Sequence, residues 1–266
     1  MPTYTDQLQR SISLPSSPQR IISLVPSQTE LLFSLGLETE VVGITKFCVH
    51  PDSWFRHKRR VGGTKTVKPE LVAALQPDLI IANKEENVRE QVEALAHQYP
   101  VWISDVNTLA DSQAMIRALG MITDRATLAV DLALQIETGF ASLIPLSKPL
   151  RTAYLIWRDP YMTVGHDTFV HDMLTHCGLL NVFGNQARYP ATSVEALQAA
   201  DCQLLLLSSE PYPFKEQHIA ELQAYLPHTR ILLVDGEYFS WYGSRLLGAP
   251  AYFQSLLQQV QVGQIQ

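Results

Sequence analysis

The chain has 266 residues, of which 46% are hydrophobic and 17% charged, and its formal net charge is −6 at pH 7. This composition supplies a substantial core and excludes general disorder. The acidic balance, without a long Lys/Arg tract, excludes the electrostatic footprint of a nucleic-acid-binding protein. The three cysteines are widely spaced, which excludes a disulfide framework and a CxxC zinc site.

Residues 1–20 lack the basic segment, the apolar segment and the small-residue cleavage site of a secretory signal peptide. The longest apolar runs, such as residues 204–207, are of strand length and too short to span a bilayer. We therefore expect either that the protein stays in the cytoplasm or that an export signal is missing from the sequence.

The first half of the chain alternates short strands and helices. A buried strand at residues 21–25 leads into Ser27 and Glu30, which predict a capping box for a helix that ends at Gly36. Such alternation predicts a parallel, doubly wound α/β sheet. Further strands are expected at residues 41–44, 79–82 and 101–104, and further helices at residues 69–75 and 88–97.

A long apolar helix is predicted at residues 124–143. Apolar side chains recur every four positions at Leu128, Leu132, Ile136 and Phe140. We expect this helix to span roughly 30 Å and to be buried on more than one side. It is either a connector between two lobes or the core helix of a single domain. The residues that widen its apolar surface are Ala129, Val130, Ala133 and Leu134.

The second half of the chain repeats the alternation of the first. Residues 70–82 (ELVAALQPDLIIA) align without a gap on residues 195–207 (EALQAADCQLLLL), so each half has a glutamate, a small-residue helix and an apolar strand in the same order. This repeat favours two α/β lobes joined by the long helix. The expected divisions are a lobe at residues 1–122, the connecting helix at residues 123–146 and a second lobe at residues 147–266.

Glu70 and Glu195 hold equivalent places in the two repeated segments. A carboxylate in the first turn of a helix is stabilised by the helix dipole, and Thr192 with Glu195 has the spacing of a capping box. Capping alone is therefore one explanation. The alternative is that two exposed carboxylates, one in each lobe, dock a two-fold partner that presents arginines.

Catalytic motifs are weak in this sequence. It contains no GxSxG elbow, P-loop or dinucleotide fingerprint. Cys48 and His50 have a CxH spacing, but two ligands do not make a metal site. We therefore expect neither an enzyme nor an intrinsic metal or cofactor, and no catalytic residue is assigned.

Aromatic and cationic residues gather beside the expected strand ends. In open α/β sheets, ligands bind beyond the carboxyl ends of the strands, and flat apolar rings with a few polar groups suit a bulky, partly polar ligand. Some of these residues are expected to pack the loops instead. The candidate ligand-binding residues are Phe47, Lys65, Trp157, Arg158, Tyr161, Tyr189, Phe239, Trp241, Tyr242 and Arg245.

Several segments, in the right order and over nearly the whole chain, resemble the periplasmic substrate-binding proteins for iron–siderophore complexes and cobalamin. Residues 20–30 (RIISLVPSQTE) look like the opening strand and helix of that family. Its helix-to-strand signature resembles residues 68–81. The start of its second lobe resembles residues 165–183 (GHDTFVHDMLTHCGLLNVF), and its second docking segment resembles residues 189–195.

The resemblance implies two α/β lobes joined by one helix, with a metal chelate or corrinoid bound between them and delivered to an ABC importer. It implies that Glu70 and Glu195 bind arginines of the permease, that the receptor is a monomer and that it is periplasmic. The closest pattern looks like the cobalamin-binding branch, with Phe47 and Tyr189 at aromatic positions. A tryptophan typical of that branch falls near Lys65 and is absent here. Cobalamin, a ferric siderophore and haem are the expected ligands.

The runner-up interpretation is a cytoplasmic carrier or sensor for a corrinoid or metal chelate, built on the same fold. The missing signal pattern motivates it. A small-molecule enzyme has the least support, because no catalytic group is ordered by the sequence.

Overall fold

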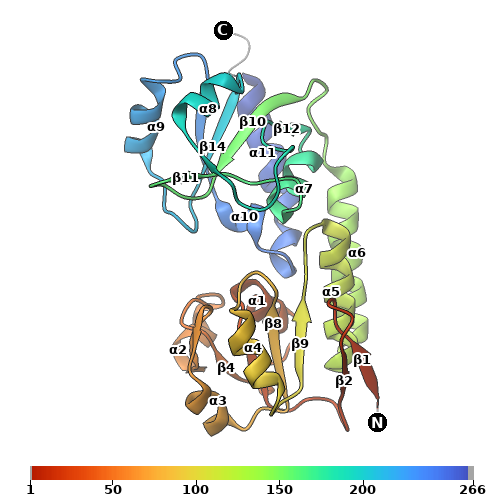
Figure 1. The fold of residues 1–266 in the computed structure, drawn as a ribbon. Helices are drawn as coiled ribbons and strands as arrows, with labels where there is room; N and C mark the ends of the chain where they lie inside the picture. Colours follow the sequence, from red (N-terminus) through yellow and green to blue (C-terminus); the bar gives the residue numbers. More distant parts are fainter. Residues whose placement is uncertain (1, 263–266) are drawn as a thin grey trace. The chain divides into compact units, whose positions relative to one another are not determined.

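The computed structural model describes residues 2–262. The chain divides into two compact units, each with its own parallel sheet (Figure 1). The prediction of two α/β lobes is confirmed. The first unit comprises Met1–Val106, Ala110–Gln135 and Tyr242–Arg245, and the second comprises Asn107–Leu109, Ile136–Trp241 and Leu246–Gln266.

The first unit is built from short strands and helices in alternation. Its elements and the long helix that leaves it are β1 (Thr3–Thr5), β2 (Ser11–Ser13), β3 (Ile21–Ser23), α1 (Pro26–Ser34), β4 (Val41–Ile44), α2 (Asp52–His57), β5 (Arg59–Arg60), β6 (Gly62–Gly63), β7 (Thr66–Val67), α3 (Pro69–Leu75), β8 (Leu79–Asn83), α4 (Arg89–Ala96), β9 (Val101–Ser104), α5 (Leu109–Ile122) and α6 (Ala126–Ser142).

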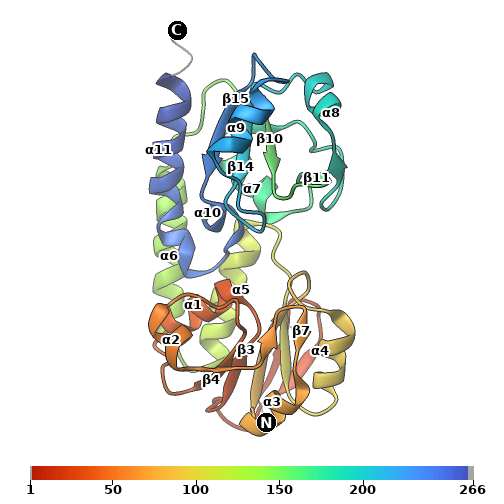
Figure 2. The same cartoon turned by 90° about the vertical axis from the view of Figure 1, so that its left-hand side faces the viewer.

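The main sheet of the first unit has the order β5-β4-β3-β8-β9, and every neighbouring pair is parallel. Figure 2 shows β3 beside β4. The chain moves outward from β3 to β5 and then returns to the other side of β3 to form β8 and β9. The topological switch therefore lies between β3 and β8, which is where open α/β sheets bind ligands.

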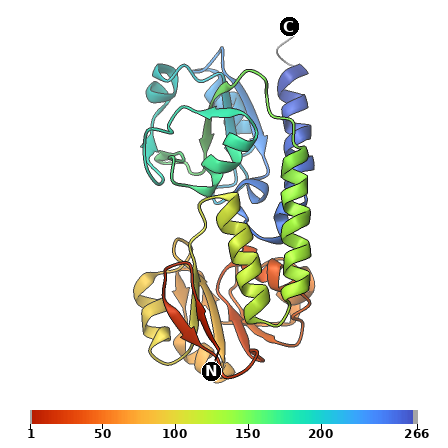
Figure 3. The ribbon, with the colours of Figure 1, turned by 90° about the vertical axis from the view of Figure 1, so that its right-hand side faces the viewer.

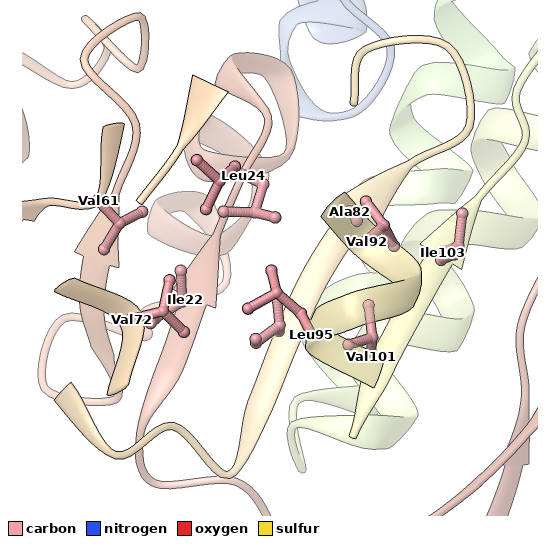
Figure 4. Close-up of a cluster of buried hydrophobic side chains, with 11 residues drawn as sticks. Ile22, Leu24, Val61, Val72, Ala82, Val92, Leu95, Val101 and Ile103 are labelled. Atoms are coloured by element: carbon pink, nitrogen blue, oxygen red, sulfur yellow. The ribbon is translucent and has the colours of Figure 1, made fainter. Parts of the chain in front are cut away.

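One face of this sheet is covered by α3 and α4 (Figure 4). Ile22 and Leu24 point from the end of β3 toward Val72 of α3 and toward Val92 and Leu95 of α4, and all of these side chains are buried. The alternation of strand residues gives one apolar side chain to this core at every second position. The apolar core of this unit therefore lies between this face of the sheet and the two helices.

The start of α1 differs from the prediction. The helix begins at Pro26, its N-cap is Val25, and no side chain caps it. Proline suits the first helical position because its missing N–H would be unpaired there in any case. The predicted capping box of Ser27 and Glu30 is therefore wrong. Gly36 follows the helix with a φ of 72°, the left-handed conformation that glycine adopts readily at a helix end.

The long helix α6 runs from residues of the first unit into residues of the second, with the division after Gln135. Its buried residues form one stripe that includes Leu132, Ile136 and Phe140. By contrast, Leu128 and Leu134 are 50% and 56% exposed. The expectation of burial on more than one side is therefore wrong, because only one face of the helix is covered.

Helices α5 and α6 of the first unit are packed very closely (Figure 3). A Cβ atom added to Gly120 of α5 would lie 2.2 Å from the Cβ of Ala129 in α6. No side chain fits in that space, so the small residues set the distance between the two helices.

The second unit repeats the strand order of the first, without an equivalent of the edge strand β5. Its elements are β10 (Leu150–Leu155), β11 (Tyr161–Met162), α7 (Phe169–His176), β12 (Leu179–Asn181), β13 (Ala191–Thr192), α8 (Val194–Ala199), β14 (Leu204–Ser208), α9 (Glu216–Gln223), β15 (Arg230–Val234), α10 (Gly236–Ser240) and α11 (Ala249–Val262), with a 3₁₀ helix at Ser244–Leu247 where the chain returns from the first unit.

The sheet of the second unit has the order β12-β10-β14-β15 and is also parallel throughout. Its switch point lies between β10 and β14. Leu197 of α8 and Leu222 of α9 are buried in the core on one face. Beside the sheet, the final turns of α6 lie next to α11, where Gly139 faces Pro250 (Figure 2).

The N-cap of helix α8 lies one residue later than the predicted N-cap, Thr192. Ser193 is the N-cap, and its hydroxyl accepts a hydrogen bond from the N–H of Ala196 at 3.2 Å. The predicted capping box at Thr192 is therefore wrong, although Glu195 does lie in the first turn of the helix as expected. Its carboxylate consequently lies beside unpaired backbone N–H groups.

Candidate functional site

The carboxyl end of β4 in the first unit presents an exposed aromatic ring. Phe47 lies three residues after this strand and is 51% exposed, and the ammonium group of Lys46 lies 4.9 Å from its ring centroid. Lys65, at the tip of the β6–β7 hairpin, is exposed and donates a hydrogen bond to the carbonyl oxygen of Glu85. An apolar ring and a cation therefore stand at the strand ends of this sheet.

Two buried asparagines hold the loop that follows β8. The Oδ1 atom of Asn83 accepts hydrogen bonds from the N–H groups of Glu85 and Glu86, at 2.8 and 3.0 Å. Asn87 donates to the carbonyl oxygen of Thr64 at 3.0 Å. The sequence analysis did not single out these residues. Their place directly after an apolar strand was the available signal, because polar side chains there commonly shape a ligand-facing loop.

The returning segment Tyr242–Arg245 is held tightly against the first unit. Tyr242 is 6% exposed. Burial raises the pKa of Tyr242 well above its usual value. The guanidinium group of Arg245 binds the carboxylate of Glu30. Both candidate side chains are thus engaged in attaching this segment.

In the second unit, the carboxyl end of β10 presents an exposed tryptophan. Trp157 is 41% exposed and Tyr161 is half-buried. Arg158 lies beside them, but its Nη2 atom is 2.6 Å from Oε1 of Glu221, so its charge is already compensated. Burial raises the pKa of Tyr161, while Arg158 opposes the shift. This rim offers a large apolar ring with little unbalanced positive charge.

Tyr212, which the sequence analysis did not select, lies against Trp157. The two rings make an edge-to-face contact with centroids 5.9 Å apart. Tyr212 follows β14, the strand on the far side of the switch point from β10. The prolines that flank it indicate a loop. They do not indicate the contact with Trp157, because that contact joins residues from two separate strand ends.

Two of the candidate aromatics belong to the core of the second unit. Phe239 is completely buried, with its ring centroid 5.1 Å from that of Tyr154 and 4.7 Å from that of Phe253. Trp241 is 7% exposed, and its Nε1 atom donates to Oε1 of Glu210 at 2.8 Å. These contacts are those of packing residues. Tyr189 is half-buried, with the guanidinium group of Arg188 5.7 Å from its ring centroid.

Glu70 and Glu195 are both exposed and lie in the first turns of α3 and α8. Each helix leads into the strand beside the first strand of its sheet, β8 in one unit and β14 in the other. The hydrogen bond with Ser193 lowers the pKa of Glu195, so this carboxylate is ionised at neutral pH. The two glutamates are therefore equivalent in position within their units.

Within residues 2–262, no group of three or more His, Cys, Asp and Glu side chains is arranged to hold a metal ion. Cys48 is buried and lies 3.1 Å and 3.2 Å from the hydroxyl oxygens of Thr29 and Thr45. Burial raises the pKa of its thiol. The described helices also include none that is both long and apolar enough to cross a bilayer.

Comparison with known proteins gives matches over most of the chain. A family model described as periplasmic binding protein matches residues 21–225. The vitamin B12-binding protein of Vibrio parahaemolyticus is 26% identical over 204 residues, which is 74% of each chain.

Two solved structures are similar in fold. The periplasmic vitamin B12-binding protein BtuF of Vibrio cholerae has a TM-score of 0.76 and 23% identity, over 93% of this chain and 99% of its own. The periplasmic haem-binding protein HutB of Vibrio cholerae has a TM-score of 0.77 and 20% identity, over 90% of this chain and 98% of its own. Ligands as different as these can evidently be carried by one fold.

Proposed function

This chain belongs to the periplasmic binding protein family, and we propose that it is an extracytoplasmic receptor that captures a corrinoid or metal chelate for an ABC importer. The observation that carries the proposal is the match to vitamin B12-binding relatives. The family is one of binding proteins, which supports a role in capture rather than catalysis. Cobalamin is the first ligand to test, and haem and ferric siderophores come next.

The exposed rings support a broad, largely apolar ligand. Phe47 of the first unit and Trp157 of the second are half-exposed at the carboxyl ends of their sheets. Exposed aromatic rings in such places suit the flat faces of a corrin or a porphyrin. We therefore propose Phe47 as the main ligand contact of the first unit and Trp157 as that of the second, with Lys65, Tyr161 and Tyr189 as candidate polar contacts within their own units.

The two candidate arginines are already engaged by carboxylates. Arg158 is paired with Glu221, and Arg245 is paired with Glu30. A ligand carboxylate would have to compete with these partners, whereas amide groups need no unpaired cation. This supports cobalamin, whose rim carries amides, ahead of haem.

Thermal unfolding with a ligand panel tests the proposal. Cyanocobalamin, haemin, a ferric hydroxamate and a ferric catecholate are each added at saturating concentration. A ligand at 100 times its dissociation constant stabilises the folded protein by roughly 2.7 kcal/mol, so a true ligand raises the melting temperature. If none of the four does so, the proposed ligand class is wrong.

Paired substitutions test the assigned contacts. Phe47→Ala and Trp157→Ala are expected to weaken ligand binding. Tyr225→Ala is the matched control, because Tyr225 is 58% exposed and lies between α9 and β15 at the opposite ends of the strands. An equal loss of ligand affinity in Tyr225→Ala would show that removing any exposed ring weakens binding through stability, and not through a lost ligand contact. Osmotic-shock fractionation of the native host tests the extracytoplasmic location.

A further inference from the structure

An aromatic cluster formed by Trp157, Tyr212, Phe214 and His218 links the surface of the second unit to its interior. The ring centroid of Tyr212 lies 5.9 Å from that of Trp157 and 5.6 Å from that of His218. Phe214 closes the cluster, 4.8 Å from Tyr212 and 5.5 Å from His218. Trp157 is 41% exposed, whereas His218 is 3% exposed. The cluster therefore runs from an exposed ring to a buried imidazole.

The imidazole of His218 caps the N-terminus of α9. Its Nδ1 atom is 2.8 Å from the backbone nitrogen of Lys215, the N-cap residue, and accepts a hydrogen bond from that N–H. Glutamate or glutamine makes the same bond at this helical position in a capping box. An accepting Nδ1 carries no proton, so the proton of the neutral ring is on Nε2. Nε2 lies 3.4 Å from the hydroxyl oxygen of Tyr212.

Tyr212 is the point where three parts of the unit meet. Its backbone N–H donates to the carbonyl oxygen of Ile156, at the end of β10, at 3.2 Å. Its hydroxyl oxygen faces Nε2 of His218. Because its ring also contacts Trp157 edge to face, a movement of Tyr212 changes the packing around the ring of Trp157.

We propose that His218 is a positioning residue for ligand binding, which in its neutral form holds Tyr212 and thereby orients the ring of Trp157. The inference rests on the proposed function in one respect, that Trp157 contacts the ligand. A side chain without an acceptor at this position leaves the N–H of Lys215 without its hydrogen bond. Its loss therefore loosens the start of α9, Tyr212 and Trp157 together.

The charged and titratable groups near the imidazole are identified by their contacts. Tyr212 faces Nε2, and the neutral amide of Gln217 lies 3.5 Å from the same atom. Lys215 and Glu216 begin α9 with exposed side chains. Arg158, the residue after Trp157, is paired with Glu221 and lies 3.8 Å from Asp159. Asp159 and Glu221 are thus directed toward Arg158.

The link between His218 and Trp157 can be measured without any ligand. Protein labelled with 5-fluorotryptophan gives four ¹⁹F resonances, because the chain has four tryptophans. The resonance of Trp157 is assigned as the one that disappears in Trp157→Phe. At pH 7.5, the chemical shift of Trp157 is expected to differ between the unmodified protein and His218→Leu, which has no acceptor for the N–H of Lys215. Trp54 and Trp102, both buried in the first unit, serve as internal references.

The variant His218→Gln separates positioning from general stability. Glutamine preserves the capping bond, so the Trp157 resonance of His218→Gln is expected to stay close to that of the unmodified protein. A Trp157 resonance that is the same in His218→Leu as in the unmodified protein would overturn the proposal. So would an equal displacement of this resonance in His218→Gln and His218→Leu.

Binding of cyanocobalamin at pH 7.5 supplies the second readout. His218→Leu, which has no acceptor, is expected to bind about tenfold more weakly, and His218→Gln to bind within about twofold of the unmodified protein. Equal affinities for all three proteins would contradict a role for His218 in binding. If the unmodified protein does not bind cyanocobalamin, the proposed ligand is wrong, and the ¹⁹F comparison of the variants still decides the role of His218.

Discussion

Arg245 binds Glu30 through two contacts, from Nη2 to Oε1 at 2.8 Å and from Nε to Oε2 at 3.1 Å. The residues are 215 positions apart in the sequence, and their side chains are only 17% and 20% exposed. Two parallel contacts between a guanidinium group and a carboxylate form one of the stronger ion-pair geometries. This pair fastens the returning segment Tyr242–Arg245 to α1 of the first unit.

Glu30→Gln and Arg245→Ala are each expected to lower the free energy of unfolding by about 1–3 kcal/mol, because the remaining partner stays partly buried. Chemical denaturation of the two single variants and the double variant measures the coupling. The exposed pair Arg89–Glu93, at 83% and 51% exposure, is the control. Its coupling is expected to be at most about 0.5 kcal/mol, and an equal value for both pairs would contradict the prediction.

The contact between Glu30 and Arg245 could not be predicted from the sequence. Glu30 has the spacing of a capping box, which is a rule about neighbours, and the rule failed because Pro26 starts the helix without a side-chain cap. Arg245 stood among aromatic residues, which suggested a ligand. Its partner lies in a different half of the chain, and no local pattern reports such a contact.

Other features were predictable because they depend on local periodicity. The alternation of strands and helices identified both parallel sheets, and the repeat beginning at Glu70 and Glu195 identified two units. Burial was harder to predict. Phe47 and Phe239 both follow apolar strands, yet one is 51% exposed and the other is completely buried. The difference arises from Phe253 of α11, whose contact with Phe239 depends on tertiary packing.

Gly120→Ala is expected to destabilise the first unit by about 1–3 kcal/mol, the usual range for overpacking a filled interior. The added Cβ would meet that of Ala129 at 2.2 Å, so α5 and α6 would have to separate. Thermal unfolding measures the loss. Ala129→Gly in the same background removes the clash and should restore part of the stability. If the double variant is less stable by the sum of the two single effects, close packing is not the cause.

The buried thiols predict a loss of stability at alkaline pH. Burial raises the pKa of Cys177 to about 12 and that of Cys202 to about 11, from an ordinary value of 9.0. The unfolded chain therefore releases these protons first. The stabilising contribution is complete below about pH 9 and is lost as the pH rises toward these folded-state values, by up to about 1.4 kcal/mol per pH unit for each thiol.

Denaturation of the unmodified protein and Cys177→Ala between pH 8 and pH 10.5 tests this alkaline effect. Other groups titrate in that range, so the quantity to compare is the difference between the two slopes. Cys177→Ala is expected to have the shallower slope. Parallel slopes would mean that the thiol ionises equally easily in the folded and unfolded protein.

Glu70→Gln and Glu195→Gln are expected to weaken binding to the cognate ABC permease and to leave ligand affinity unchanged. Both carboxylates are exposed in the first turns of α3 and α8, where they are free to bind arginines of a partner. Binding of the purified receptor to permease in lipid nanodiscs, measured at two salt concentrations, should show weaker binding and a smaller salt dependence in each variant.

The controls for docking are Glu90→Gln and Glu216→Gln. These glutamates are also exposed in the first turns of helices, α4 and α9 respectively. All four substitutions remove the same stabilising interaction with a helix dipole, worth about 0.3–1 kcal/mol each, so a general loss of stability affects them alike. A selective loss of permease binding at Glu70 and Glu195 identifies docking residues, whereas a uniform loss across all four variants would reduce these two carboxylates to helix caps.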